Sequence, residues 1–418
     1  MSLPITAKTN KNSHLEIGGC DVAELAKKYG TPLYVIDEAT LRENCRNYID
    51  SFKAAYPNSE IAFASKALCT VGISKLIAGE GLGFDVSSGG ELFTVLKAGA
   101  DPKKIYFHGN NKTLQEIEEG LKAGIGRFMV DNVEELANLE AIAGKLKKTA
   151  NIMIRVNPGI DAHTHEFIQT GKTDSKFGVP LDQLDAFVQK IKTLKSVKLK
   201  GLHAHIGSQI LDVKPFVEEA KLLLDLTLKY QTEELNLGGG LGISYSPDQK
   251  PPAVADFARA IAAVLKGKTK AKLILEPGRS IVGTAGITLY TVGVIKEIPG
   301  IRQYIIVDGG MADNPRPILY DAKYEAMLGN KMGRADTATV RVAGRFCESG
   351  DILVKEIKLP KVEAGDILVT TCTGAYNYSM ASNYNRVPRP AMVLVGGGKS
   401  SVILKREKYE DLVRNDAD

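Results

Sequence analysis

Cysteine is scarce in this sequence, and a long apolar run is lacking altogether. The 418 residues include five cysteines, with no CxxC pair among them: Cys20, Cys45, Cys69, Cys347 and Cys372. An odd number without close pairs argues against a disulfide framework or a zinc ribbon. We therefore expect a reducing, cytoplasmic environment. Because no apolar run approaches the roughly 20 residues of a membrane helix, and residues 1–14 are polar, we expect neither a membrane span nor a signal peptide.

A strong excess of one charge is also missing. The chain has 54 basic and 49 acidic residues, a net charge of +5. The basic residues are spread along the chain, so nothing indicates a nucleic-acid surface. A hydrophobic content of 44% and a charged content of 25% are typical of a globular protein. The length allows one large domain and a smaller one.

Short apolar strands alternate with amphipathic segments through the middle of the chain. Such alternation predicts parallel strands joined by helices, and eight repeats in about 250 residues are typical of a (β/α)8 barrel. We predict a TIM-like α/β barrel over residues 36–282. Its expected strands are 61–66, 83–88, 105–110, 128–132, 151–158, 199–208, 234–240 and 272–279. The expected helices include 90–99, 113–124, 133–147, 181–195, 213–230 and 252–266.

The pattern changes after residue 282. Segments 286–298, 303–308, 337–343 and 366–371 are predicted strands, several of them rich in β-branched residues. The first 35 residues lack the barrel rhythm, and we expect residues 15–36 to pack on this β domain. Residues 1–35 and 283–418 are therefore assigned to a second, mostly β domain.

Polar residues recur where the predicted barrel strands end. The carboxyl ends of barrel strands carry the active sites of such enzymes, so these residues predict a site at that end. They are Lys66; Asp85, Ser87 and Ser88; His108 and Asn110; Arg155 and Asn157; His205 and Ser208; Gly238, Gly239 and Gly240; and Glu276, Pro277, Gly278 and Arg279.

Lys66 follows an apolar strand. A lysine there is commonly a solvent-facing strand end or part of a structural ion pair. The alternative is a Schiff-base lysine, whose amine must lose its proton to attack a carbonyl. The glycine run and Glu276 at the other strand ends favour that alternative, in which Lys66 anchors a carbonyl cofactor.

Two glycine-containing loops predict a phosphate site. Glycines let backbone N–H groups approach a phosphate closely, although a glycine run is also common in flexible turns. Barrel phosphate sites use the loops after strands 7 and 8, where Gly238–Gly240 and Arg279 lie. Glu276 could pair with Arg279, or could hold a pyridine nitrogen protonated so that the ring accepts electrons.

Histidines at alternate positions raise the question of a metal. His203 and His205 share one strand face, and His163 and His165 show the same spacing. No suitably placed cysteine or third ligand accompanies them, so we predict no metal. His205 could instead stack on a cofactor ring, and His203 could lie in the barrel core.

The β domain contributes a further candidate at Cys347. A free cysteine is usually a small buried apolar residue, but the polar neighbours of Cys347 and the adjacent Glu348 suit proton transfer. Tyr376 could present its phenol to a phosphate.

A series of motifs between residues 63 and 376 resembles the diaminopimelate decarboxylases, pyridoxal-phosphate enzymes of the alanine-racemase-like barrel group. The segments are FASKA at 63–67, GFDVSSGGEL at 83–92, GLHAHIGSQ at 201–209, NLGGGLG at 236–242, EPGR at 276–279, NPRP at 314–317, CESGD at 347–351 and GAY at 374–376. Because they occur in the family's order, the resemblance covers most of the chain.

The resemblance implies a role for each residue. Lys66 would carry pyridoxal 5'-phosphate as a Schiff base, Glu276 would face the pyridine nitrogen, His205 would stack on the ring and Cys347 would return a proton. Further cofactor contacts would come from Asp85, Ser208, Gly239, Gly240, Pro277, Gly278, Arg279 and Tyr376. Substrate contacts would come from Arg279, Arg316, Tyr320, Glu348 and Tyr376. In this family the Cys347 and Glu348 positions reach the partner's site, which implies a homodimer.

The implied reaction is a carboxy-lyase reaction, conversion of meso-2,6-diaminopimelate to L-lysine and CO2 in the last step of lysine biosynthesis. The far end of this substrate carries an ammonium and a carboxylate, which Glu348 and Arg316 can pair with. Alternatives are a sibling decarboxylase for ornithine, arginine or carboxynorspermidine, an amino-acid racemase, and a non-catalytic carrier or regulatory protein that binds pyridoxal phosphate.

Overall fold

A computed structural model describes residues 2–160 and 175–417 in two compact units. The β unit comprises residues 1–43, 243–250 and 281–418, and the barrel unit comprises residues 44–242 and 251–280. Each unit has its own core. The segment 243–250 lies within the range predicted for the barrel but groups with the β unit, so the chain leaves the barrel for a short excursion after the glycine loop.

The barrel unit contains the eight predicted parallel strands in the predicted order. They run in sequence as β5 (Ser59–Ala64), β6 (Gly83–Val86), β7 (Ile105–Phe107), β8 (Arg127–Val130), β9 (Ala150–Asn157), β11 (Val197–His203), β12 (Glu234–Asn236) and β13 (Lys272–Leu275). Pairing of β8 with β9 and of β13 with β5 closes the sheet. The predicted barrel is therefore confirmed. A two-residue strand, β10 (Val179–Pro180), adds to β9 outside the ring.

The strands end earlier than predicted, which leaves the polar residues on the connecting loops. β12 ends at Asn236, whereas the prediction continued through Gly240. Gly238 and Gly240 have φ angles of +58° and +122°, which do not belong to extended strands. The positive φ values place the glycine run in a loop above the sheet.

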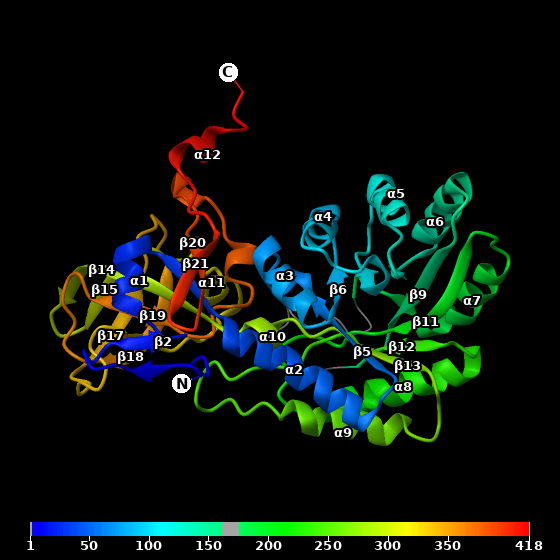
Figure 1. The fold of residues 1–418 in the computed structure, drawn as a ribbon, viewed down its shortest axis with the longest axis horizontal. Helices are drawn as coiled ribbons and strands as arrows, with labels where there is room; N and C mark the ends of the chain where they lie inside the picture. The colour runs from blue at the N-terminus through cyan, green and yellow to red at the C-terminus, as the bar shows by residue number, and fades with distance from the viewer. Residues whose placement is uncertain (1, 161–174, 418) are drawn as a thin grey trace. The chain divides into compact units, whose positions relative to one another are not determined.

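Helices follow the strands around the outside of the barrel (Figure 1). Their apolar faces cover the sheet, and polar caps fix where several begin; Thr113, for example, forms a capping box with Glu116 at the start of α5. The helices that follow β5 to β12 are α3 (Val71–Gly79), α4 (Gly89–Lys97), α5 (Leu114–Ala123), α6 (Val133–Leu146), α7 (Leu184–Lys192), α8 (Lys214–Tyr230) and α9 (Val254–Leu265). The helix α2 (Glu38–Ala55) precedes β5, and the short helix α10 (Arg279–Val282) follows β13.

Side chains fill the barrel interior. One buried cluster takes a residue from each of five strands: Ala62, Tyr106, Met129, Met153 and Ile274. Packed layers of this kind make the barrel a core rather than a pore, so ligands can reach only its ends.

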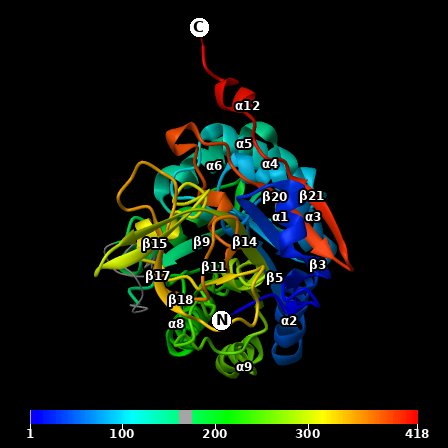
Figure 2. The same cartoon turned by 90° about the vertical axis from the view of Figure 1, so that its left-hand side faces the viewer.

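The β unit is built on a sheet that contains β18 (Ile352–Leu359), β17 (Ala338–Ala343), β15 (Arg302–Val307), β14 (Gly286–Ile298), β4 (Leu33–Asp37), β20 (Ala391–Gly396) and β21 (Lys399–Leu404), in that order. β19 (Ile367–Thr370) pairs with β14 and with β16 (Ala326–Leu328). Figure 2 shows β15, β17 and β18 on one side of this unit and β20 and β21 on the other. The short elements are β1 (Lys8–Thr9), β2 (Leu15–Ile17), β3 (Cys20–Asp21), α1 (Val22–Tyr29), α11 (Arg316–Tyr320) and α12 (Tyr409–Val413).

The N-terminal segment packs on the β unit, as predicted. Leu15, Ile17, Leu33 and Val35 are buried with residues of β14, β19 and β20 in one cluster. β4 completes the contact because it pairs with both β14 and β20. The β unit therefore needs both ends of the chain.

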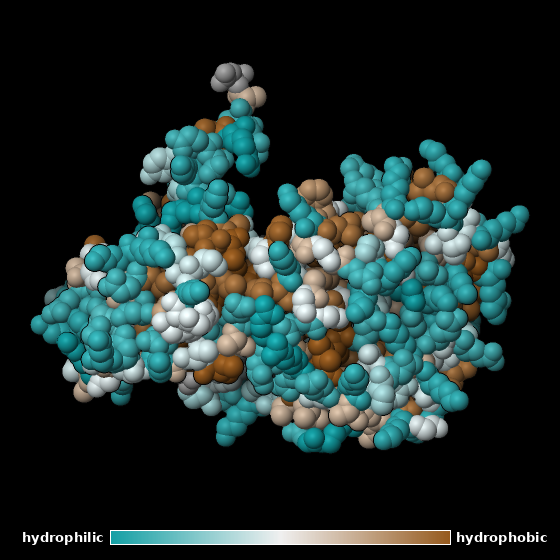
Figure 3. Space-filling model, viewed as in Figure 1, coloured by the Kyte–Doolittle hydropathy of each residue, from teal (hydrophilic) through white to brown (hydrophobic). Residues whose placement is uncertain are grey.

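Among the described residues, no helix combines the length and the apolar character needed to cross a membrane. The face shown in Figure 3 is largely hydrophilic over the barrel helices, with apolar residues in smaller groups.

Candidate active site

Lys66 lies directly after β5, in a short 3-10 turn (Ser65–Ala67) at the carboxyl end of the barrel strands. It is the one exposed residue between positions 61 and 68, while its neighbours anchor the turn in the core. The charge of Lys66 contributes to the pKa values of Asp85 and His205, so the three groups share one electrostatic environment. The structure thus places Lys66 at the predicted site.

Glu276 follows β13 and is buried, with 4% of its surface exposed. Its Oε1 accepts a hydrogen bond from Asn236 Nδ2 at 2.6 Å and lies 2.8 Å from His108 Nε2. Its Oε2 lies 3.4 Å from His203 Nε2. Although burial alone would raise the pKa of Glu276, His108 and His203 hold it well below its usual range. Glu276 is therefore a buried carboxylate that stays ionised.

The pKa values of the two imidazoles beside Glu276 shift in opposite directions. Burial would lower the pKa of His108, but Asp85 and Glu276 raise it above its usual value. Burial lowers the pKa of His203 to about 4, so that ring is neutral near pH 7. The Asp85 carboxylate lies 3.7 Å from His108, which places the His108 ring between two acids.

Three of these residues have a spacing that would suit a metal. His108, His203 and Glu276 each offer a ligand atom, all within 4.8 Å of one another. An ion there would replace the hydrogen bonds that Glu276 makes with His108 and Asn236, so we interpret the group as a hydrogen-bond network. His205 is not a member of it, and His163 and His165 lie outside the described residues.

The glycine loop packs against His205 and against the chain around Glu276. Gly239 N–H lies 3.3 Å from His205 Nδ1, and a Cβ on Gly239 would lie 2.1 Å from the Glu276 carbonyl oxygen. A Cβ on Gly240 would lie 2.4 Å from the carbonyl oxygen of Gly207. Any side chain here would push the loops after β11, β12 and β13 apart.

Ser208 and Arg279 complete this corner of the site. Arg279 Nη2 donates to Ser208 Oγ at 2.9 Å, although the two residues are 71 positions apart. Arg279 opens α10 directly after Pro277 and Gly278. The loops after β11, β12 and β13 therefore offer a hydroxyl, a guanidinium and glycine backbone to one region, which is the donor set that a phosphate requires.

His205 is half-buried beside this loop. Burial, together with the charges of Lys66 and Arg155, lowers its pKa well below the usual value. The ring is therefore neutral, as suits an imidazole that stacks on an aromatic group.

The remaining predicted residues belong to the β unit. Cys347 and Glu348 lie exposed on a turn between β17 and β18. Asn385 Oδ1 accepts the Cys347 N–H at 3.0 Å. Asp351 accepts the N–H groups of Phe346 and Met311 at 2.8 and 2.7 Å, so the side chains of Asp351 and Asn385 hold the backbone at Phe346 and Cys347.

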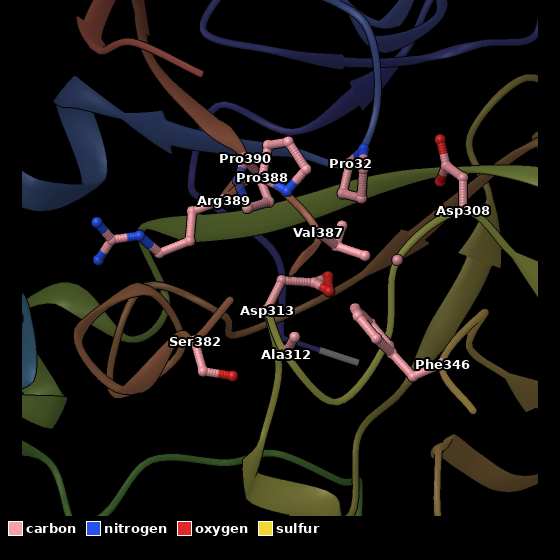
Figure 4. A pocket seen from close by; sticks show the side chains of 11 residues that line it. Pro32, Asp308, Ala312, Asp313, Phe346, Ser382, Val387, Pro388, Arg389 and Pro390 are labelled. Atoms are coloured by element: carbon pink, nitrogen blue, oxygen red, sulfur yellow. The ribbon is translucent and has the colours of Figure 1, made fainter. Parts of the chain in front are cut away.

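A small cavity lies behind this turn (Figure 4). Phe346, the neighbour of Cys347, and Asp313 point toward one another in it. Burial raises the pKa of Asp313 to about 7. None of the predicted site residues lines this cavity, so it supports the turn and is not itself the predicted site.

Arg316 is buried at the start of α11, with 5% of its surface exposed. Tyr320 ends the same helix, and Tyr376 is half-buried with a φ of +62°. Arg316 Nη1 donates to Tyr324 Oη at 2.5 Å. Arg316 therefore contacts an aromatic side chain, and the motifs did not predict this contact.

The sequence analysis missed several residues of this arrangement. Asn236 carried a signal, since it directly precedes the glycine loop, and His108 was noted at a strand end without a role. Nothing in the sequence pointed to Tyr245 and Tyr324, because a single tyrosine outside a motif does not indicate a functional site.

Three comparisons bear on these residues. Residues 40–283 match the pyridoxal binding domain of the pyridoxal-dependent decarboxylases. The diaminopimelate decarboxylase of Synechocystis is 49% identical, over 99% of this chain and 92% of that protein. The Bacillus subtilis enzyme of the same name is 45% identical, over 100% and 98%.

Solved structures agree with the relatives. The structure of diaminopimelate decarboxylase from M. jannaschii in complex with L-lysine is 38% identical, with a TM-score of 0.94 over 100% of this chain and 99% of that one. The Helicobacter pylori enzyme, also with L-lysine, is 35% identical, with a TM-score of 0.88 over 94% and 98%.

Proposed function

Because the chain belongs to the diaminopimelate decarboxylases, a family of pyridoxal-dependent decarboxylases, we propose that it converts meso-2,6-diaminopimelate to L-lysine and CO2. The observation that carries the proposal is the ionised Glu276 at the barrel mouth, held by His108 and Asn236 near Lys66 and the glycine loop. This reaction is the last step of lysine biosynthesis.

The residues present fit pyridoxal phosphate. Lys66, an exposed residue, would provide the amine of the covalent link, and Ser208, Gly239, Gly240 and Arg279 would lie around the phosphate. Glu276 offers an ionised carboxylate to the ring nitrogen. Bound there, the cofactor would supply an aromatic system that accepts the electron pair left when CO2 departs.

Each of these groups of the protein would then have its own role. Glu276 would keep a proton at the ring nitrogen, and neutral His205 would lie against the ring. Lys66 would hold the cofactor covalently between turnovers. The substrate would lose the carboxylate of its D-configured carbon as CO2, and the Cys347 thiol would supply the one proton that this carbon takes up. Tyr376 and Arg279 would contact the phosphate and the substrate.

The charge of Arg316 supports a substrate with a second carboxylate. Its guanidinium is buried, its Nε has no hydrogen-bond partner and no acidic side chain pairs with it among the described residues. A buried cation without a counter-charge is costly, and a ligand carboxylate would supply the missing charge. Ornithine has no carboxylate at its far end, so a site for ornithine would not use Arg316. Glu348 would pair with the far ammonium, beside Tyr320.

The site would be completed in a homodimer, with Cys347 and Glu348 of one subunit at the barrel of the other. Large apolar side chains support this arrangement because they are exposed on the helices that follow β5 to β8, at or near their first turns: Val71, Phe93, Leu114 and Val133. They lie along one part of the rim at the end of the barrel that carries the site, where a partner would bury them.

We place the enzyme in the cytoplasm, since the five cysteines are unpaired.

Substrate specificity is tested by incubating the holoenzyme with meso-diaminopimelate, ornithine, arginine and carboxynorspermidine while CO2 and the chirality of the product are measured. We expect CO2 and L-lysine from meso-diaminopimelate alone. Racemised substrate without CO2 would indicate a racemase, and no turnover of any substrate would indicate a carrier.

The cofactor link is tested separately by borohydride reduction and peptide mapping. The adduct is expected on Lys66 and should be absent from a Lys66→Ala control. An adduct on any other lysine would overturn the mechanism.

A further inference from the structure

Two tyrosines surround the Arg316 guanidinium. Its central carbon lies 4.5 Å from the ring centroid of Tyr245 and 5.4 Å from that of Tyr324. The two rings meet edge to face, with centroids 5.4 Å apart and planes at 73°. Both tyrosines are at most 4% exposed. We call Tyr245 and Tyr324 the aromatic cage.

The cage is assembled from distant parts of the chain. Tyr245 comes from residues 243–250, the excursion that follows the glycine loop, and Tyr324 lies between α11 and β16. The Tyr324 hydroxyl accepts the bond from Arg316 Nη1 and donates to Asn377 Oδ1 at 3.3 Å. Asn377 is fully buried, so it fixes the hydroxyl that holds the arginine.

Two partly exposed arginines of this chain are held differently. Arg127 makes two bonds to the Glu234 carboxylate, at 2.7 and 2.5 Å, and Arg389 likewise pairs with Glu407. An acid beside Arg316 would compete with a ligand carboxylate. Aromatic faces stabilise a cation without using its in-plane N–H donors, so the cage holds the charge and leaves donors for a ligand.

We propose that Tyr245 and Tyr324 are positioning residues that determine specificity, because they direct the Nε edge of Arg316 to the carboxylate at the far end of the substrate. The described contacts use Nη1 and a ring face, whereas Nε has no partner. The Nε edge of a guanidinium is one that can bind a carboxylate through two parallel bonds. This inference rests on the proposed function and deepens it.

The test compares ligands that differ at that carboxylate. L-Lysine keeps the far ammonium and carboxylate, whereas cadaverine lacks the carboxylate. Dissociation constants are measured on the holoenzyme from the change in cofactor absorbance, for the wild type and for Tyr324→Phe, Tyr245→Leu and Tyr245→Phe. The control is Tyr34→Phe, which removes another buried hydroxyl of the β unit, one that donates to the Asp313 carbonyl.

Tyr324→Phe removes only the hydroxyl, and Tyr245→Leu removes a ring. Each should weaken L-lysine about tenfold or more, and each should leave cadaverine within about twofold of the wild type. Tyr245→Phe keeps the ring and should restore most of the L-lysine affinity. For turnover, kcat/KM should fall for meso-diaminopimelate but not for D-lysine, which lacks the far carboxylate.

Two results distinguish a failure of this inference from a failure of the proposed function. Suppose that the wild type converts meso-diaminopimelate. If the cage variants then bind both ligands as Tyr34→Phe does, or lose affinity for both ligands equally, the cage has no role in specificity and the inference is overturned. If the wild type does not convert meso-diaminopimelate, the proposed function is overturned, and with it the role of the cage for this substrate.

Discussion

Replacement of His108 should weaken the binding of pyridoxal phosphate through Glu276. The His108 Nε2 lies 2.8 Å from Glu276 Oε1, and both residues are more than nine-tenths buried. His108→Leu removes the partner of an ionised group and leaves Asn236 as the remaining donor to Oε1. His108→Gln serves as the matched variant, because its amide can still donate to the carboxylate.

The hydrogen bond between His108 and Glu276 determines how large the loss of cofactor affinity should be. A hydrogen bond to a charged group contributes about 1.5–3 kcal/mol, and one pKa unit corresponds to about 1.4 kcal/mol. His108→Leu should therefore raise the pKa of Glu276. If the ring nitrogen needs the ionised carboxylate, cofactor affinity should fall by up to about 10- to 100-fold toward the acid end of the pH range.

The pH dependence of cofactor affinity follows from the direction in which the pKa of Glu276 changes. In the wild type the pKa of Glu276 lies well below its usual range, so the carboxylate stays ionised as the pH falls from 8 to 5. In His108→Leu the raised pKa brings protonation of the carboxylate closer to the acid end of that range. The loss of affinity should therefore grow toward acid pH in His108→Leu and much less in His108→Gln.

The assay is a titration of the apoprotein with pyridoxal phosphate, followed by absorbance between pH 5 and 8. Urea unfolding of the apoproteins checks that the barrel is intact. His14→Leu is the control, because it removes a histidine–carboxylate contact of 2.9 Å to Asp21 in the β unit. Affinity within about twofold of the wild type for His108→Leu across this range, or equal losses for Leu and Gln, would refute the argument.

Three further predictions concern the ion pairs and the proton donor. Lys112→Met should destabilise the protein by about 3–5 kcal/mol in urea unfolding, because the buried amine of Lys112 bonds to Glu135 at 2.6 Å. Adding Glu135→Gln should recover part of this loss. A loss below about 1 kcal/mol for Lys112→Met would contradict the prediction. Glu407, whose pKa is lowered to about 2 mainly by Arg389 against the effect of burial, should contribute stability above its unfolded pKa that disappears as the pH falls toward 2. The effect is about 1 kcal/mol after allowance for solvent screening, and Arg389→Met should abolish it in unfolding measured from pH 6 to 2. Cys347→Ala should slow product formation about 10²- to 10⁴-fold in single-turnover assays while cofactor absorbance stays unchanged; unchanged turnover would exclude Cys347 as the proton donor.

Local sequence patterns were sufficient for much of the architecture. The eight barrel strands lie in the predicted order, and β14 has the predicted bounds of residues 286–298. The errors lie at strand ends such as β12, where glycine backbone takes left-handed φ angles that hydrophobic periodicity does not register. Lys66 and Glu276 could be placed at one end of the barrel because parallel strands share a direction.

The sequence by itself determined the barrel, the β domain and the order of the motifs, because periodicity and turn residues act over short stretches of chain. Only the tertiary structure decided which polar groups meet. His108 and Glu276 are 168 residues apart, and Tyr245 and Arg316 belong to segments that no motif connects. Contacts of this kind depend on the closure of the whole sheet and on the excursion at residues 243–250. The charge states of Glu276, His108 and His203 follow from those contacts and from burial, which no local stretch of the sequence records.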